Sequence, residues 1–350
     1  MSLFSAREFS NFKDPWGLLT RMVRSGDRAA LASLTRAATE IVATPLDGAL
    51  SRRERRLVEQ GDQPSQPLVL VVGGARTGST MVYQMLAAAL PVSYFTNVTG
   101  VFPRSPITAT GLLVRDWDRP SADLHSFYGQ TARWTGPNDG FAVWNRWFGH
   151  DRYVAQGVPV DEAGRADMRA FFGAWTRLFP RPFLNKNNRN TSVVAQLADL
   201  LPTAVFVSVS RDPLYVGQSL VMARQRVQGD RRVPWGLNAQ STVDPSLPGQ
   251  DPMAYLDDVA AQVHRTEAQL REQLAGLPQS RWIELAYEDV CRDPGDAIRR
   301  VADLVPGLEM RPSSLDGPRP DAPGNTDRLG EAELQRLRDA LDLRYGEATG

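Results

Sequence analysis

The sequence predicts an α/β protein whose mostly parallel central sheet is covered by helices on both faces. Two short apolar runs, Leu68–Val72 and Ala204–Ser210, have the length and composition of buried strands, and each passes directly into a helical pattern. Further short apolar runs at residues 91–95, 182–185 and 281–286 alternate with helical patterns along the chain. With 350 residues, of which 42% are hydrophobic, the chain is long enough to bury one large core.

Residues 1–66 differ from the rest, and we predict that they form an N-terminal helical extension and a linker. Apolar residues recur at helical spacing on both sides of Gly26, which indicates two amphipathic helices, and Pro45 is expected to end the second. The run SRRERR at 51–56 is interpreted as a solvated helix face, with docking of an acidic acceptor or a lipid head group as the alternative. The polar run DQPSQP then leads into the main domain, residues 67–350.

The overall composition argues against several partners and locations. Forty Lys and Arg residues balance forty Asp and Glu residues, so no global field attracts nucleic acid or an acidic membrane. No apolar run approaches the length of a transmembrane helix, and the first residues lack the apolar core of a signal peptide. The single cysteine, Cys291, allows no intrachain disulfide and fits a reducing cytoplasm. We therefore expect a soluble cytoplasmic protein, and its preference for Arg over Lys is typical of a GC-rich bacterial genome.

A glycine-rich loop follows the first predicted strand and has the form of a phosphate cradle. Residues 73–80 read GGARTGST and join that strand to an Ala-rich helix whose first turn holds two hydroxyl residues. Backbone N–H groups between glycines, together with the positive end of a helix, bind anions. The alternative is a strand-to-helix turn that binds nothing.

The loop departs from a Walker A motif at one position. Gly73, Gly78 and Thr80 fit the pattern G-x-x-x-x-G-K-[ST], but Ser79 stands where the lysine belongs. That lysine reaches the β- and γ-phosphates of a nucleoside triphosphate, so its loss argues against ATP or GTP hydrolysis. The cation lies inside the loop instead, at Arg76, which suits a ligand with one 5′-phosphate and a small anionic extension.

A second strand-to-helix junction carries an arginine and a serine. Arg211 follows the strand Ala204–Ser210, and Ser219 lies two turns into the next predicted helix, so both side chains can close on one phosphate. The alternative is that Asp212 caps the helix, Pro213 takes its first position, and Arg211 forms a surface ion pair. That alternative leaves the spacing from Arg211 to Ser219 unexplained.

Together the two junctions resemble the PAPS-dependent sulfotransferases, which use 3′-phosphoadenosine 5′-phosphosulfate (PAPS). GGARTGST is similar to the family's phosphosulfate loop and SRDPLYVGQS to its 3′-phosphate motif, in the same order and the same strand–helix context. A weaker match, YEDV at 287–290, resembles a segment that follows the family's late strand. The resemblance spans residues 67–305 and extends more weakly to about 340.

This resemblance implies a P-loop-like, three-layer α/β/α catalytic domain and a PAPS-dependent sulfotransferase that needs no metal. The expected acceptor is a hydroxyl of a carbohydrate, lipid or secondary metabolite, and the second product is adenosine 3′,5′-bisphosphate (PAP). The resemblance assigns the leaving phosphate to the loop and the 3′-phosphate to the second junction. The implied cofactor-binding residues are Gly74, Arg76, Thr77, Gly78, Ser79, Thr80, Arg211 and Ser219.

The acceptor is expected to bind in an insertion at about residues 96–180, where the family's acceptor-binding insertions fall. Within it, residues 127–153 interleave aromatic with polar side chains, which suits a pocket for a sugar or a flat organic acceptor. For Trp144, Trp147 and Phe148 we prefer the simpler interpretation that they form the core face of one helix.

Three residues are candidates for catalysis: Asp139, His150 and Lys186. Lys186 ends a short predicted strand and resembles a lysine that some carbohydrate sulfotransferases place near the transferred group; the alternative is a surface lysine. Asp139, in GPNDG, resembles the acidic position of an E-P-x-E-like segment in some bacterial members, although Gly136 replaces the first acid. A type I turn also explains this segment. We rank Asp139 first and His150 second as the general base.

Two other functions remain in view. A nucleotide kinase-like P-loop transferase is disfavoured by Ser79 and by the lack of a clear Walker B acid. A degenerate nucleotide-binding module would keep the fold without the base. The sequence leaves open the acceptor, the contacts of residues 1–66 and the oligomeric state, for which a homodimer is one option.

Overall fold

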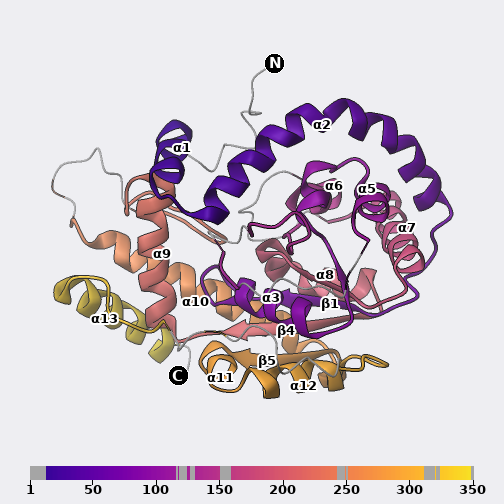
Figure 1. The fold of residues 1–350 in the computed structure, drawn as a ribbon. Helices are drawn as coiled ribbons and strands as arrows, with labels where there is room; N and C mark the ends of the chain where they lie inside the picture. Colours follow the sequence, from indigo (N-terminus) through magenta and orange to yellow (C-terminus); the bar gives the residue numbers. More distant parts are fainter. Residues whose placement is uncertain are drawn as a thin grey trace.

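A parallel sheet forms the centre of the molecule (Figure 1). The computed structural model describes residues 13–115, 117, 124–126, 131–149, 159–242, 249, 251–310, 320 and 324–347. Within them the sheet has the order β2–β3–β1–β4–β5, and every neighbouring pair is parallel. Its strands are β1 (Leu68–Val72), β2 (Ser93–Tyr94), β3 (Phe183–Lys186), β4 (Ala204–Ser210) and β5 (Trp282–Ala286). The predicted α/β fold with a mostly parallel sheet is confirmed.

Helices cover both faces of the sheet, as the alternating side chains of β1 show. Leu68, Leu70 and Val72 belong to a core shared with α7 (Glu162–Leu178) and α8 (Val194–Leu200). Val69 and Val71 belong to a second core, which is shared with α3 (Ser79–Ala89) and α12 (Pro294–Leu304). The arrangement is therefore the predicted three-layer one.

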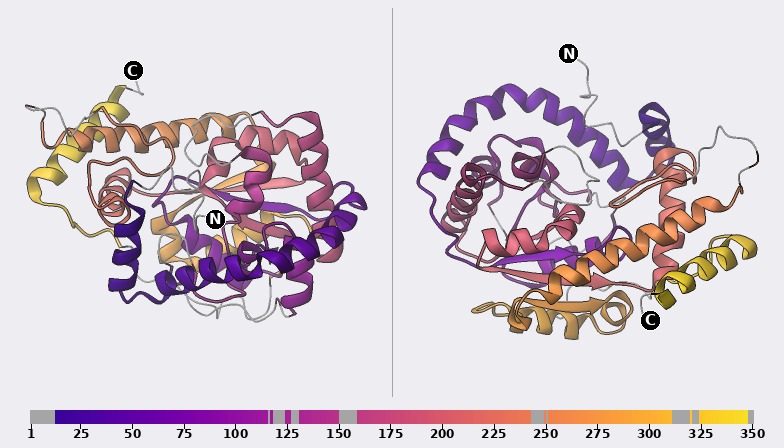
Figure 2. Two further views of the ribbon diagram at one scale, coloured as in Figure 1. Left: turned by 90° about the horizontal axis from the view of Figure 1, so that it is seen from above. Right: turned by 180° about the vertical axis from the view of Figure 1, so that it is seen from behind.

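A third apolar cluster lies at one end of the sheet, where three helices pack together. These are α9 (Pro213–Gln228), α10 (Ala254–Ala275) and α13 (Glu331–Glu347), and Figure 2 shows them side by side. The shorter helices are α4 (Asn97–Val101), α5 (Pro106–Leu113), α6 (Phe141–Phe148) and α11 (Tyr287–Arg292), with the 3-10 turns η1 (Asn188–Ser192) and η2 (Gln279–Arg281).

The N-terminal region forms two helices that break near Gly26, as predicted, but the second does not end at Pro45. They are α1 (Pro15–Arg24) and α2 (Arg28–Glu59), and α2 arches over α5 and α6 in Figure 1. A proline inside a helix costs about 3 kcal/mol. Buried contacts beyond Pro45 hold the helix in place.

Two buried carboxylates on the inner face of α2 supply those contacts. Asp47 accepts hydrogen bonds from the hydroxyl of Ser105 and the backbone N–H of Arg104, at 2.6 and 3.1 Å. Glu54 caps the start of α5 by accepting from the N–H groups of Ile107 and Thr108, at 3.0 and 2.8 Å. The interpretation of residues 51–56 as a solvated face is therefore wrong for Glu54, which is only 2% exposed.

The linker before β1 and the aromatic helix both follow expectation. Residues 62–67 form no regular secondary structure. Trp144, Trp147 and Phe148 lie on α6 and are buried in the core that is shared with α7 and α8, as the simpler interpretation expected. The boundary at residues 66 and 67 and the acceptor-binding role of residues 96–180 stay predictions.

Candidate functional site

The two strand-to-helix junctions meet because β1 and β4 are neighbours in a parallel sheet. The loop after β1 has an unusual backbone, with φ values of 145° at Gly73, 74° at Arg76 and 92° at Gly78. At Gly78 a Cβ atom would lie 2.3 Å from the ring of Tyr287, so glycine is required both for the backbone and for that contact. Arg76 adopts the left-handed conformation without being glycine, which is a strained arrangement typical of binding sites.

Helix α3 begins at the loop with its backbone donors available. Gly78 is the N-cap, and within the described part of the chain no side chain caps this helix start. The loop is braced internally, since the hydroxyl of Thr77 donates to the carbonyl oxygen of Gly74 at 2.9 Å. Ser79 is buried in the first turn and Thr80 beside it is half-buried. Such a helix start binds anions.

A side-chain contact joins the two junctions directly. Arg76 Nε donates to Ser219 Oγ at 2.9 Å, which connects the loop to the second turn of α9. Arg211, at the end of β4, donates from Nη1 to the carbonyl oxygen of Arg76 at 3.3 Å. Three of the sequence-predicted residues therefore converge on one point at the carboxyl edge of the sheet.

Arg211 is held on three sides. Its Nε and Nη2 atoms donate to Asn325 Oδ1 at 3.0 and 2.7 Å, and Nη2 also donates to the carbonyl oxygen of Gly324. The guanidinium carbon lies 4.5 Å from the ring centroid of Tyr287, at cation–π distance. Arg211 is therefore held in the site, and among the described residues it has no partner for the surface ion pair of the alternative interpretation.

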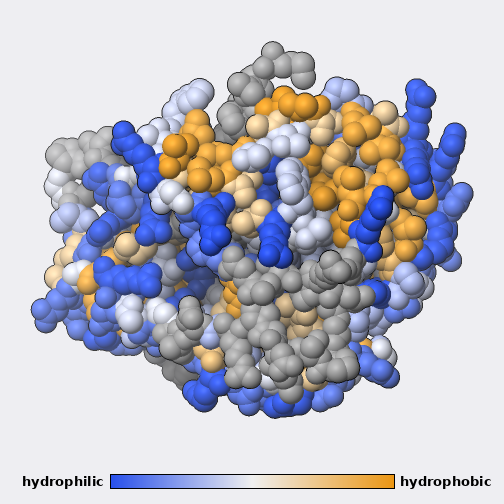
Figure 3. All heavy atoms as spheres, viewed as in Figure 1, coloured by the Kyte–Doolittle hydropathy of each residue, from blue (hydrophilic) through white to orange (hydrophobic). Residues whose placement is uncertain are grey.

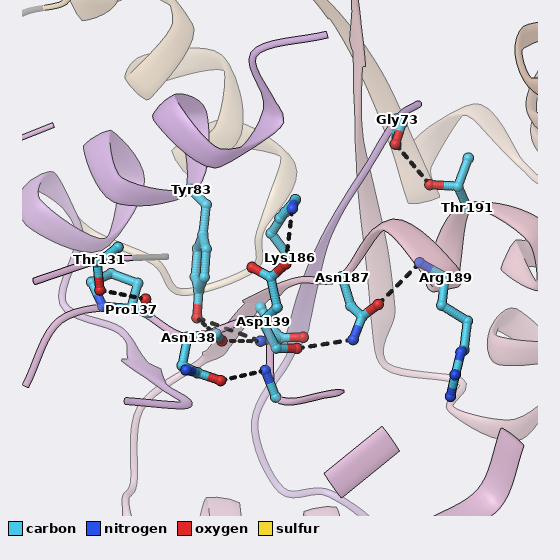
Figure 4. Close-up of polar contacts among 12 residues, drawn as sticks. Gly73, Tyr83, Thr131, Pro137, Asn138, Asp139, Lys186, Asn187, Arg189 and Thr191 are labelled. Atoms are coloured by element: carbon cyan, nitrogen blue, oxygen red, sulfur yellow. Dashed lines mark hydrogen bonds and ion pairs between the residues drawn. The ribbon is translucent and has the colours of Figure 1, made fainter. Parts of the chain in front are cut away.

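A second group of polar residues lies at the end of β3, next to β1. Lys186 Nζ and Asp139 Oδ2 form an ion pair at 3.0 Å, with side chains that are only 3% and 9% exposed. Figure 4 shows the two side chains pointing toward each other. Lys186 is therefore not a surface lysine. A buried pair of this kind is costly to break, because removal of one partner leaves the other charge without compensation.

Amide groups hold the turn that carries Asp139. Asn187 Nδ2 donates to the carbonyl oxygen of Asp139 at 3.0 Å (Figure 4). Asn185 Nδ2 donates to the carbonyl oxygen of Asn138 at 3.1 Å. Tyr83 on α3 donates to the same Asn138 oxygen. Burial raises the pKa of the Tyr83 phenol well above its usual value, and the Asp139 carboxylate adds to this, so the phenol stays a donor.

Thr191 connects this polar group to the loop after β1. Its hydroxyl accepts from the N–H of Gly73 and donates to the carbonyl oxygen of the same residue, each at 3.0 Å. Thr191 belongs to η1, which starts two residues after Lys186. The loop after β1 therefore contacts both the Arg211 junction and η1, and η1 directly follows the strand that carries Lys186.

The sulfotransferase family model matches residues 67–312, well over half of the chain. This protein is a member of the sulfotransferase family. Among curated protein sequences, none matches it significantly.

Two mycobacterial crystal structures share the fold of this chain. The sulfotransferase STF1 from Mycobacterium tuberculosis H37Rv has a TM-score of 0.55 and 13% identity, over 97% of this chain and 93% of that chain. The sulfotransferase STF9 from Mycobacterium avium has a TM-score of 0.53 and 14% identity, over 86% of this chain and 80% of that chain. At such low identity these likenesses show the fold alone.

The two described histidines contact residues outside this site. His125 Nε2 lies 2.9 Å from Asp27 Oδ2 at the start of α2, with its side chain 52% exposed. His264, on α10, packs edge-on against Tyr345 of α13. His150, the second candidate for the base, lies outside the described residues.

Sequence reasoning missed several residues that shape the site. Asn325, which occupies the donors of Arg211, comes from a loop before α13 and carries no local signal. Thr191 has the sequence context of a helix cap and nothing that points to the loop after β1. Tyr287 belongs to the weakly matching YEDV segment, and its contacts with Gly78 and Arg211 give that match a structural basis.

Two kinds of feature are absent from the described residues. They contain no group of three His, Cys, Asp or Glu side chains that could hold a metal ion. None of their helices combines the length and the apolar character that crossing a membrane needs.

Proposed function

We propose that this sulfotransferase transfers a sulfuryl group from PAPS to a hydroxyl of a carbohydrate, lipid or secondary-metabolite acceptor. The observation that carries the proposal is the convergence of Arg76, Ser219 and Arg211, joined by contacts of 2.9 and 3.3 Å. Two phosphate-binding elements this close suit a nucleotide with phosphates on both its 5′ and 3′ positions. The single cysteine, Cys291, supports a cytoplasmic location as part of the same proposal.

The residues present fit such a nucleotide. The uncapped start of α3 and the backbone of residues 74–80 would hold the 5′-phosphosulfate, with the side chains of Arg76, Thr77, Ser79 and Thr80 beside it. Arg211 and Ser219 would hold the 3′-phosphate, which would compete with Asn325 for the Nε and Nη2 donors of Arg211.

We assign the chemistry at the acceptor to the buried pair. Asp139 takes the proton from the acceptor hydroxyl, whose oxygen forms the new S–O bond while the bond from sulfur to the leaving phosphate oxygen breaks. PAPS supplies the sulfuryl group in this step. Lys186 orients Asp139 through their contact, and its charge favours the negative charge that spreads over the transferred group.

Turnover of PAPS carrying labelled sulfate, with a panel of hydroxyl acceptors, tests the proposal. The expected result is label on one acceptor class, with one PAP released for each label transferred. PAP binding without transfer to any acceptor would favour the degenerate nucleotide-binding module instead.

A further inference from the structure

The outer face of α2 carries an exposed apolar strip. It consists of Leu31, Ile41, Val42 and Leu46, whose exposures are 40, 45, 81 and 54%. The other fully exposed positions between residues 31 and 49 are Thr, Ala or Pro, and none of them is charged. Figure 3 shows apolar side chains gathered along the upper part of the molecule, where α2 runs in Figure 1.

Exposed arginines lie at both ends of this apolar strip. Arg24 and Arg28 are exposed where α1 passes into α2. Arg52, Arg53, Arg55 and Arg56 are exposed in the last two turns of α2. Glu54, the acid within this run, is turned inward to cap α5, so it neutralises none of them at the surface. Of the other acids on α1 and α2, Glu40 is half-buried and Glu59 is exposed.

A second copy of the chain is a poor occupant for this face. In a two-fold dimer the same surface of both partners meets, so each set of arginines would face arginines of the other copy. The acids of the two helices that are not buried are the half-buried Glu40 and the exposed Glu59, so such a contact would bring mostly like charges together. A partner that supplies an apolar layer and negative charge fits better.

We propose that the outer face of α2 docks this protein on the surface of an anionic lipid bilayer. The apolar strip enters the boundary between head groups and acyl chains, and the arginines bind the lipid phosphates. The equal numbers of acids and bases in the whole chain do not oppose this, because the arginines act locally within a Debye length of the membrane.

The inner face of the same helix leads toward the candidate transfer site. Arg36 Nη1 donates to Asn97 Oδ1 at 2.6 Å, and the same oxygen accepts from Asn138 Nδ2 at 2.8 Å. Asn138 precedes Asp139 in the chain. Docking would therefore bring the segment that carries Asp139 toward the lipid surface. If the proposed function holds, this favours an acceptor hydroxyl on an amphiphile.

Cosedimentation with lipid vesicles tests the docking without reference to activity. The full chain is mixed with vesicles of phosphatidylcholine, with or without phosphatidylglycerol, at low and high salt. We expect binding to the anionic vesicles at low salt, weakened roughly tenfold or more by high salt or by pure phosphatidylcholine.

Two variants address the two parts of the surface. Val42→Glu places a charge in the apolar strip, and replacement of Arg52, Arg53, Arg55 and Arg56 by Gln removes one set of arginines. Each is expected to weaken binding to anionic vesicles roughly tenfold or more. Leu343→Glu adds the same charge at a 63% exposed position on α13 and should bind as the unmodified chain does. Melting temperature and PAP affinity show that each variant is folded.

Three results would overturn the docking proposal. One is that the unmodified chain fails to bind anionic vesicles. Another is that Val42→Glu binds them as well as Leu343→Glu does. The third is a dimer in lipid-free solution that Val42→Glu dissociates, seen by sedimentation velocity, which would assign the face to a second copy. If the unmodified chain fails to bind PAP, the proposed function is contradicted, whereas the vesicle-binding result still decides the docking proposal.

Discussion

Asp139→Asn is expected to lower kcat for sulfuryl transfer by about 10²–10⁴-fold, the usual contribution of a general base. The reason is that an amide cannot take the proton of the acceptor hydroxyl. PAP affinity should stay within about twofold, because the nucleotide is assigned to other residues at the ends of β1 and β4. Turnover of labelled PAPS and calorimetric titration with PAP measure the two quantities on the same preparation.

The substitution leaves the buried charge of Lys186 without its counter-charge, so the melting temperature is measured together with kcat to show that the variant is folded. The amide that replaces the carboxylate would keep an oxygen that can accept from Lys186 Nζ, now 3.0 Å from Asp139 Oδ2, so the lysine retains a partner. Asp47→Asn is the matched control, since Asp47 is a buried carboxylate that accepts from Ser105 at a distance from the site. The Asp47→Asn variant should transfer the sulfuryl group at the rate of the unmodified protein. Unchanged kcat in Asp139→Asn would place the base elsewhere, with His150 the next residue to replace.

Arg211→Ala is expected to weaken PAP binding by about 1.5–3 kcal/mol, the value of a hydrogen bond to a charged group. This corresponds to an increase in Kd of roughly 10-fold to more than 100-fold. The Arg76 carbonyl oxygen and the ring of Tyr287 already hold the guanidinium in place, so it needs little further ordering when the phosphate replaces Asn325. Calorimetric titration of PAP into both proteins gives the difference.

A second ligand separates phosphate binding from support of the loop. Adenosine 5′-monophosphate lacks the 3′-phosphate, so its affinity should change little in Arg211→Ala. An equal loss for both nucleotides would mean that Arg211 acts only by holding the loop through the Arg76 carbonyl oxygen. Arg165→Ala is the control, because it removes a surface ion pair between α7 and Asp199 on α8. It should bind both nucleotides with the affinity of the unmodified protein.

The sheet and both junctions could be predicted because their signals are local. Strands β1 and β4 have the predicted bounds, since a short apolar run between turn residues leaves little choice of register. Helix α9 starts at Pro213 and ends at Gln228, and both ends have local causes, since Asp212 caps the start and Gly229 follows the end. The same reasoning placed the three aromatics of α6 in the core.

Features that depend on distant contacts could not be predicted. Helix α2 continues past Pro45 because Asp47 and Glu54 accept hydrogen bonds from residues more than fifty positions away in the chain. Lys186 and Asp139 were each singled out, yet no pattern in the sequence joins two residues that the fold brings together from separate segments. Asn325 reaches Arg211 for the same reason. Local propensity carries no information on such pairs.

Calorimetry on the unmodified protein tests the central claim, that the two junctions grip one doubly phosphorylated adenosine. PAP is titrated without divalent metal, and ATP is titrated with magnesium under otherwise equal conditions. The account predicts that PAP binds at least tenfold more tightly than magnesium-ATP and that a chelator does not change its affinity. Tight binding of magnesium-ATP with no heat from PAP would contradict it.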